Sequence, residues 1–397
     1  MMQVLENVKV LDLCRGYPPA FSAMLMADFG ADVIKVDPVG FVVPFPGTNP
    51  QAKERWSVYS FWDRNKRSIM LNLSSPQGKE ILFKLAKTAD VLLENSRPGT
   101  MERLGIAYND LKEMNPRLIY CSVSGYGQDG PYSSLVGHDS NYLGICGTLS
   151  IIGPKDGPPV MPSNIIADIA GAGLHPFMGI LLALIARQNT SRGQFIDISY
   201  TDCVFAMTGF DAAMYLLTGE KRRRGKFAQS GGAPCSAVYQ TKDGEYVTVQ
   251  IIEPVFWANF CNAIGKPDFI RRQWTKDEKE KEDMFTFLGN LFLTKTRDEW
   301  WEWAKTNQVM LAPVLYIEEA LDDPHLRYRR MVVEKEHPRL GKVIHIGNPL
   351  KLSDTPPDPY RSYSPLPGQH TDQILSELDY TEVQIAELKK QKAVEQS

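Results

Sequence analysis

The chain contains 397 residues, of which 43% are hydrophobic and 23% are charged, and its formal net charge is -3. This composition is typical of a globular protein with two or three domains, and it excludes a disordered, collagenous or coiled-coil chain. The nearly balanced charge does not predict a nucleic-acid partner.

The sequence also argues against a membrane-spanning or secreted protein. No stretch reaches the roughly 20 apolar residues of a membrane span, since the longest candidate, 174–186, is shorter and contains His175 and Pro176. The N-terminal residues lack the apolar core of a signal peptide. The six cysteines show no CxxC pair and no metal-ligand spacing, so we expect reduced thiols, no bound metal and a cytoplasmic location.

The first 130 residues alternate short apolar strands with helical segments. Strands are predicted at 8–13, 32–36, 68–73, 91–94 and 117–124, and helices at 21–29, 75–86 and 104–114. Residues 40–63 interrupt this pattern with several prolines and are expected to form a loop or cover segment. The alternation predicts an α/β domain with a largely parallel sheet.

The middle of the chain continues this domain and then changes in character. The glycines of 167–187 predict a buried helix packed closely against a neighbour, and a strand at 194–199 and a helix at 202–217 follow. Beyond them we predict a hairpin at 238–251 and helices at 256–264, 283–292 and 297–306. The proline-rich segment 349–367 resembles an extended linker, and a polar helix at 373–392 is expected to return to the first domain.

These elements predict a chain of two domains. Residues 1–224 form a large α/β domain, residues 225–330 a smaller α+β domain, and residues 331–397 a linker and C-terminal segment that returns to the large domain.

Two glycine-rich or basic motifs suggest ligand binding without identifying the ligand. The segment Gly125–Gly130 matches GxGxxG, but Pro131 follows it and no acidic residue lies about 20 positions on, so a nicotinamide cofactor is not predicted. Arg64–Arg67 precedes one predicted strand and Arg97 follows another. Each is a solvated loop charge when taken alone, whereas together they could form a phosphate-binding rim.

Three carboxylates and one imidazole are candidates for acid–base chemistry. His138 and Asp139 adjoin in a glycine-bounded loop, which suits either a base with an orienting carboxylate or a structural histidine. Asp168 lies before a glycine-rich helix, where a carboxylate is either a helix N-cap or a paired charge. Glu253 ends a predicted strand, where a surface charge is the simplest interpretation.

Landmark segments run through nearly the whole chain. They are Ala27–Val36, Arg64–Ser68, Leu92–Gly99, Asn115–Tyr120, Ser124–Gly127, Gly137–Tyr142, Ala167–Asp168, Arg192–Asp197, Gly231–Pro234, Ile252–Pro254 and Gly368–Thr371. Together they resemble the family III CoA-transferases of the CaiB/BaiF type, and most closely the α-methylacyl-CoA racemase branch. The resemblance implies a Rossmann-like large domain built from N- and C-terminal segments, a small domain, and an interlocked homodimer, with a heterodimer of related subunits as an alternative.

The resemblance also implies two possible reactions. In the racemase branch, groups matching His138 and Asp168 exchange the α-proton of an acyl-CoA, and those matching Asp139 and Glu253 support them. In the transferase branch, the aspartate matching Asp168 attacks the thioester and carries an anhydride and an aspartyl-CoA thioester. We favour the racemase because transferases usually lack the histidine, and a catalytically silent CoA-binding subunit is a third hypothesis.

Coenzyme A, as part of the substrate, is the only cofactor that the resemblance implies. Its contacts are carried over to Asn65, Lys66, Arg67, Ser68, Asn95, Arg97, Arg103, Gly137 and Tyr142. Two departures favour the transferase branch or a changed phosphate contact. Pro38 stands where relatives commonly have an arginine, and the segment 44–63 is longer than in typical racemases.

Overall fold

The computed structural model describes residues 3–41, 58 and 60–396. The chain divides into two compact units, of which the first comprises Met1–Leu143, Ser163–Ala206 and Pro324–Ser397. The second unit comprises Gly144–Pro162 and Met207–Asp323. Most of the loop predicted at 40–63, including the long segment from Pro44, lies outside the described residues.

The predicted boundaries at 224 and 330 need correction. Segments 144–162 and 207–224 belong to the second unit, and 324–330 to the first. One backbone and one side-chain hydrogen bond join segments 144–162 and 207–224, because Arg224 N donates to Ser150 O at 3.3 Å and Arg224 Nε donates to Gly157 O at 2.7 Å. Sequence spacing alone gave no sign of this pairing.

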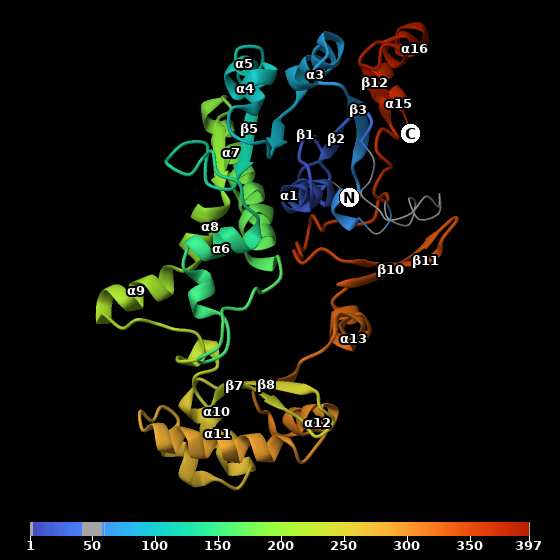
Figure 1. Ribbon diagram of the computed structural model, residues 1–397. Helices are drawn as coiled ribbons and strands as arrows, with labels where there is room; N and C mark the ends of the chain where they lie inside the picture. Colours follow the sequence, from blue (N-terminus) through green and yellow to red (C-terminus); the bar gives the residue numbers. More distant parts are fainter. Residues whose placement is uncertain (1–2, 42–57, 59, 397) are drawn as a thin grey trace. The chain divides into compact units, whose positions relative to one another are not determined.

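The first unit is built around a seven-stranded sheet in the order β12-β3-β2-β1-β4-β5-β6 (Figure 1). Its strands are β1 Lys9–Asp12, β2 Asp32–Pro38, β3 Arg67–Leu71, β4 Val91–Glu94, β5 Ile119–Ser124, β6 Phe195–Ser199 and β12 Val394–Glu395. All neighbours pair in parallel except β12, which is antiparallel to β3. The order 3-2-1-4-5-6 is that of a Rossmann-like sheet, as the family resemblance implies.

Hydrophobic residues alternate between the two faces of this sheet, and helices cover both faces. Leu11 belongs to a core with α3 (Pro76–Thr88) and the C-terminal helices, whereas Val10 belongs to a core with α1 (Tyr17–Asp28) and α7 (His175–Thr190). The remaining elements of the unit are η1 Phe61–Asp63, α4 Thr100–Leu104, α5 Tyr108–Leu111, α6 Asp139–Ile145, η3 Ile165–Leu174, α8 Tyr200–Met207, α14 Pro324–Tyr328, β10 Val332–His337, β11 Gly341–Ile346, α15 Thr371–Glu377 and α16 Glu382–Lys390.

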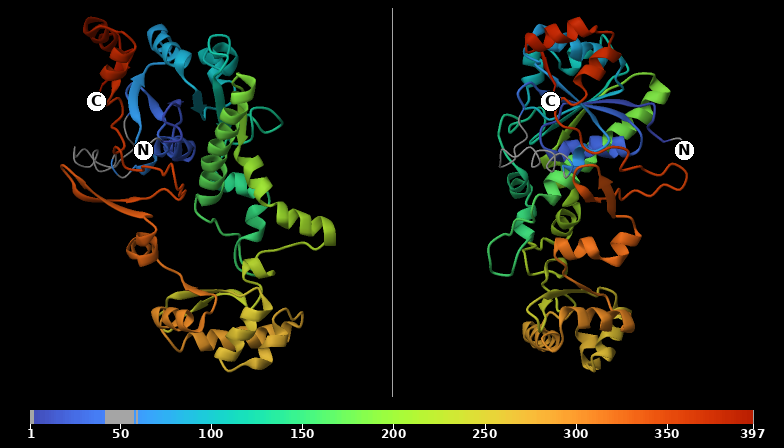
Figure 2. Two further views of the ribbon diagram at one scale, coloured as in Figure 1. Left: turned by 180° about the vertical axis from the view of Figure 1, so that it is seen from behind. Right: turned by 90° about the vertical axis from the view of Figure 1, so that its right-hand side faces the viewer.

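The C-terminal segment returns to this unit, as predicted. Strand β12 pairs with β3, and α15 and α16 pack beside it in both views of Figure 2. The predicted single helix at 373–392 is two helices, because Asp379 between them adopts a left-handed conformation with φ 64°. The helix predicted at 104–114 is the shorter α5, because α4 ends at Leu104 and Gly105 follows it in a left-handed conformation with φ 69°.

The helical run 165–190 contains wide π-type turns in η3 and continues as α7. Close packing is confirmed, since a Cβ on Gly173 would lie 3.3 Å from Pro18 O of α1. The predicted burial of the whole helix is wrong, because Leu182 is 68% exposed and Ile185 is 58% exposed. The run is long and apolar enough to cross a membrane by length and composition, contrary to the sequence estimate, but a core helix of a soluble protein passes the same test.

The proline-rich segment 349–367 contains no helix or strand and packs along the first unit through contacts such as Asp358 N to Asp28 O at 2.8 Å. All six cysteines are free thiols.

The second unit has its own core beneath a three-stranded sheet in the order β7-β8-β9, with α10, α11 and α12 against one face (Figure 2). Its elements are η2 Thr148–Ile151, α9 Gly209–Thr218, η4 Ala228–Ser230, β7 Ser236–Gln240, β8 Tyr246–Gln250, α10 Pro254–Ala263, η5 Pro267–Arg272, α11 Glu278–Phe292, α12 Arg297–Asn307, β9 Leu311–Pro313 and α13 Ile317–Asp322. The predicted hairpin is therefore confirmed.

Candidate active site

A cleft of about 730 Å³ opens where β1 and β4, which are neighbours in the sheet, send their following loops apart. Crevices at such a change of strand order are where open α/β sheets bind ligands. The chain that follows β1 and β4 contributes Arg15–Pro18 and Asn95–Pro98 to its lining, and the end of β5 contributes Val123–Gly125. Residues of 133–142, Asp168 and Tyr200 complete it.

A second cavity of about 530 Å³ adjoins this cleft. It lies beyond the carboxyl ends of β2 and β3, and it is lined by Val36–Val39, Leu71–Ser74 and Lys392. The two cavities share Arg15 and Asn95–Arg97, so they form one extended groove with two basic side chains at its centre.

His138 and Asp168, predicted as the acid–base pair, line the same cleft. His138 is exposed just before α6, whereas Asp168 is half-buried in η3. Burial raises the pKa of the Asp168 carboxyl above its usual range, and a hydrogen bond from Tyr17 and the charge of protonated His138 oppose this rise. The two side chains are therefore close enough to influence each other electrostatically.

Asp139 has a different partner from the one that the sequence suggests. Its Oδ2 accepts hydrogen bonds from the backbone N–H groups of Ala167 and Asp168, each at 3.0 Å, and does not orient the imidazole of His138. The carboxylate is 8% exposed and thus satisfies two N–H groups in the first turn of η3. Asp139 positions the backbone that carries Asp168.

Asp168 is not the N-cap of its helix, because η3 begins after Asn164. Its carboxyl Oδ2 instead accepts a hydrogen bond from the Tyr17 hydroxyl at 2.9 Å. The N–H of Asp168 already donates to Asp139, so it is not a free donor for a developing oxyanion. The π-type turns of η3 are a common feature of functional sites in helices.

Tyr142 and Gly137 shape the wall of the cleft. The Tyr142 hydroxyl donates to Gly137 O at 2.5 Å, and its ring lies 4.9 Å from that of Tyr200. Burial raises the pKa of Tyr142 to about 12, so the phenol stays neutral near pH 7. A Cβ on Gly125 or Gly137 would lie 2.6 or 2.8 Å from Tyr142, which explains the glycines on both sides of this ring.

The basic residues after β4 separate into two groups. Arg97 is exposed and lines both cavities, and Asn95 holds the loop after β1 by donating to Arg15 O and accepting from Arg15 N, each at 2.8 Å. Arg103 donates to Thr100 Oγ1 at 2.9 Å on the exposed side of α4 and does not line either cavity. The CoA contact implied for Arg103 is therefore not supported.

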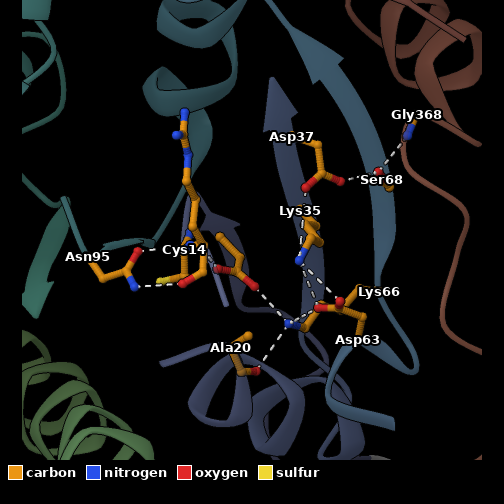
Figure 3. Close-up of polar contacts among 11 residues, drawn as sticks. Cys14, Ala20, Lys35, Asp37, Asp63, Lys66, Ser68, Asn95 and Gly368 are labelled. Carbon is orange, nitrogen blue, oxygen red and sulfur yellow. Dashed lines mark hydrogen bonds and ion pairs between the residues drawn. The ribbon is translucent and has the colours of Figure 1, made fainter. Parts of the chain in front are cut away.

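Lys66, which the resemblance assigns to CoA, is fully buried in a cluster of charges (Figure 3). Its Nζ lies 2.7 Å from Asp12 Oδ2 and 2.9 Å from Asp63 Oδ1, and Asp63 also pairs with Lys35 at 3.1 Å. Burial alone would lower the pKa of Lys66, but the two carboxylates outweigh it and raise that pKa. The ammonium group links the end of β1 to the segment before β3 and lines neither cavity of the groove.

Arg67 has also found partners within the protein. It pairs with Asp32 at 2.7 Å and with Glu377 at 2.6 Å. Ser68 donates to Asp37 Oδ2 at 3.0 Å and accepts from Gly368 N at 2.8 Å (Figure 3).

Asn65 follows the same pattern, since its Nδ2 donates to Asp28 Oδ1 at 2.9 Å and to Asp358 O at 2.8 Å. Asn65, Lys66, Arg67 and Ser68 line neither cavity of the groove. Of the two parts of the predicted phosphate rim, Arg97 lines the groove and the segment before β3 does not, because a ligand crevice is formed by the carboxyl ends of parallel strands and these residues come before or at the beginning of β3. Asn72–Ser74, at the other end of β3, line the groove instead.

Glu253 is exposed at the N-cap position of α10 in the second unit. Its supporting role in the reaction stays a prediction.

Sequence reasoning gave no role in the site to Arg15, Tyr17, Ser124 or Tyr200, which line the cleft. Ser124 Oγ is buried and has no hydrogen-bond partner among the described residues. All four follow or end strands β1, β5 and β6, so the rule that ligands bind beyond the carboxyl ends of parallel strands could have found them.

The fold and the site together define a Rossmann-like α/β protein with a carboxyl–imidazole pair in its ligand crevice. The family model of CoA-transferase family III matches residues 5–371. The chain therefore belongs to CoA-transferase family III.

Individual relatives are similar over almost the full length of the chain. Alpha-methylacyl-CoA racemase of Homo sapiens is 35% identical over 98% of this chain and 97% of its own length. Formyl-CoA:oxalate CoA-transferase of Rhodopseudomonas palustris is 33% identical over 98% of this chain and 96% of its own length. The structure of a CaiB/BaiF family protein from Brucella suis matches with a TM-score of 0.80 and 26% identity, covering 96% of this chain and 100% of that one.

Proposed function

We propose that this protein is a racemase or epimerase of 2-methyl- or other 2-substituted acyl-CoA thioesters. The single observation that carries the proposal is that His138 and Asp168 line one cleft and interact electrostatically. Racemisation needs a base on one face of the α-carbon and an acid on the other. The similarity to alpha-methylacyl-CoA racemase supports the same reaction class.

The proton transfer uses the two groups in opposite states for the two enantiomers. For one enantiomer, neutral His138 removes the α-proton, the C–H bonding pair moves into a planar enolate, and protonated Asp168 delivers a proton to the other face. For the other enantiomer, ionised Asp168 is the base and the imidazolium of His138 is the acid. Burial of the Asp168 carboxyl brings its pKa closer to that of an imidazole, which favours both directions.

The extended groove supports a coenzyme A thioester as the substrate. The thioester end would lie by Asp168, and the phosphates would lie toward Arg15 and Arg97 in the adjoining cavity. Lys392 also lines that cavity and is a candidate replacement for the arginine missing at Pro38. The unpaired hydroxyl of Ser124 is a candidate donor to the thioester oxygen, since Asp139 already uses the first N–H groups of η3.

We further propose a cytoplasmic homodimer in which coenzyme A is the only bound group. Exposed apolar side chains on α7 and α8, including Leu182, Ile185 and Phe205, form a surface that a second copy of the chain could cover, which supports the dimer.

A CoA-transferase is the second candidate function, and the Tyr17–Asp168 hydrogen bond favours it. A hydrogen bond to the carboxylate stabilises its ionised form, which is the form that attacks a thioester. Relatives named as CoA-transferases match the chain at 32–33% identity.

Solvent isotope exchange separates the two functions. Each enantiomer of a 2-methylacyl-CoA is incubated with the enzyme in deuterated water without a free acid, and the product is read by mass spectrometry. A racemase incorporates one deuterium at the α-carbon and inverts part of the substrate. Absence of exchange, with CoA transfer to an added acid, would overturn the racemase proposal in favour of the transferase.

A further inference from the structure

The start of α1 places a tyrosine hydroxyl on the candidate acid–base carboxylate. Tyr17 is the first residue of α1, and its hydroxyl donates to Asp168 Oδ2 at 2.9 Å. The other carboxyl oxygen, Oδ1, accepts no hydrogen bond within the part of the chain that the structure describes. The two oxygens of Asp168 are thus inequivalent before any substrate binds.

The backbone around Tyr17 is held firmly. Gly16 turns the chain into α1 with φ 78°, and Pro18 and Pro19 follow within the first helical turn, where proline is pre-organised for a helix. The Tyr17 ring lies 5.7 Å from the ring of Trp62 in η1. The Tyr17 hydroxyl is therefore held by a helix and not by a loop.

Helix α1 and η3, which carries Asp168, are also locked together. The Ser22 hydroxyl of α1 donates to Gly173 O of η3 at 2.5 Å, and the absence of a side chain at Gly173 lets the two backbones approach. These contacts hold the Tyr17 hydroxyl and the Asp168 carboxyl at a set distance.

We propose that Tyr17 is a positioning residue for Asp168: the Tyr17 hydroxyl stabilises the ionised carboxylate and occupies Oδ2, so that Oδ1 is the oxygen that exchanges the α-proton. This inference rests on the proposed function. When Asp168 is the base, Oδ1 forms an O–H bond with the α-proton, the C–H pair moves into the enolate, and protonated His138 returns a proton to the opposite face and becomes neutral.

The other titratable groups around Asp168 do not replace Tyr17. Asp139 adds negative charge and raises the pKa of Asp168, and protonated His138 lowers it. Tyr142 and Tyr200 are themselves raised in pKa by burial and by the Asp168 charge, so they stay neutral at the pH values of the assay. Tyr17 is the one neighbour in the described chain that lowers the pKa of Asp168 through a direct hydrogen bond.

The test is the substitution Tyr17→Phe, with Tyr200→Phe as a matched control. Both remove a phenol hydroxyl from the same cleft, but only the first removes a hydrogen bond to Asp168. Loss of that bond raises the pKa of Asp168, because its charged form loses a donor. The acid limb of kcat/KM, for the enantiomer that needs ionised Asp168, is expected to move up by about one pH unit in Tyr17→Phe and to stay in place in Tyr200→Phe.

A second readout does not depend on activity. A water-soluble carbodiimide with an amine labels protonated carboxyls, and peptide mass spectrometry follows the labelling of Asp168 against pH. We expect the labelling midpoint to rise by a similar amount in Tyr17→Phe alone. If both the acid limb and the midpoint stay at the wild-type values while activity falls, Tyr17 only fills space and the inference is overturned. If the wild type exchanges no α-proton, the proposed function fails, and the labelling midpoint still decides the role of Tyr17.

Discussion

Two basic regions of the first unit, Arg64–Arg67 before β3 and the pair Arg15 and Arg97 after β1 and β4, have opposite environments. In the first region, Arg64, Lys66 and Arg67 form ion pairs with aspartates of the same chain, and Lys66 is fully buried between carboxylates. The second region lines an open groove of two adjoining cavities. Both regions look alike in the sequence as charged segments beside strands.

The comparison shows that a basic residue faces the ligand crevice only if it lies beyond the carboxyl end of a strand, whatever its charge. In a parallel sheet, the ligand crevice forms at the carboxyl ends, and the loops there are spread apart where the strand order reverses. The register places Arg67 level with Ile34, within the sheet, and it has acidic partners in reach. Arg97 lies beyond the end of β4 and keeps its side chain exposed.

The largest expected effect tests whether the Arg64–Arg67 region stabilises the fold. Lys66→Met leaves the buried Asp12 without its ion-pair partner and Asp63 with Lys35 alone, so we expect the free energy of unfolding to fall by about 3–5 kcal/mol. Urea denaturation measures this loss. Lys87→Met, at an exposed site on α3, is the control with little change. If Lys66→Met keeps wild-type stability and binds CoA more weakly, Lys66 is instead a CoA-binding residue.

The next effect tests whether the cleft beside Arg15 and Arg97 carries out acid–base chemistry through His138. His138→Ala removes one acid–base group, so α-proton exchange of the enantiomer for which His138 is the base should fall by about 10²–10⁴-fold, with stability unchanged because the ring is exposed. His325→Ala, also exposed but on α14, should keep full exchange. Undiminished exchange in His138→Ala would contradict the racemase mechanism, and undiminished CoA transfer would favour the second candidate.

A smaller effect is expected where backbone and ring meet in the cleft. Gly137→Ala places a Cβ 2.8 Å from the Tyr142 ring, and displacement of that ring should cost about 1–3 kcal/mol of stability. Gly144→Ala, whose Cβ would approach nothing closer than 4.0 Å, is the control. Thermal unfolding of the two variants is compared, and equal melting temperatures would show that Tyr142 is free to move.

The smallest effects sharpen the comparison directly. Arg97→Ala should raise the KM for acyl-CoA about tenfold, because a phosphate contact is lost, and should leave stability unchanged. Arg67→Ala should leave KM unchanged and lower the free energy of unfolding by about 1 kcal/mol, since its ion pairs are partly exposed. Steady-state kinetics and denaturation measure the two effects. A raised KM in Arg67→Ala together with lower stability in Arg97→Ala would reverse the roles given to the two regions.

The sequence by itself determined most of the fold. The strands predicted in the first 130 residues, and the helices predicted at 21–29 and 75–86, appear close to where the apolar periodicity places them, whereas α4 precedes the helix predicted at 104–114 and Gly105 ends α4. The return of the C-terminus is visible in the sequence as a polar helix after a proline-rich linker. The reason is that hydrophobic periodicity and turn residues are local signals, and they persist in the folded chain.

Only the tertiary structure decided which landmark residues form the site. The sequence named His138 and Asp168 but could not show that Asp139 holds the backbone of η3 or that Tyr17 bonds to Asp168, because these partners are 29 and 151 residues apart. It placed Lys66 with the ligand, whereas packing placed it among carboxylates. Charge and residue type are local properties, but whether a charge meets a ligand or an internal partner depends on contacts that form only when distant segments pack together.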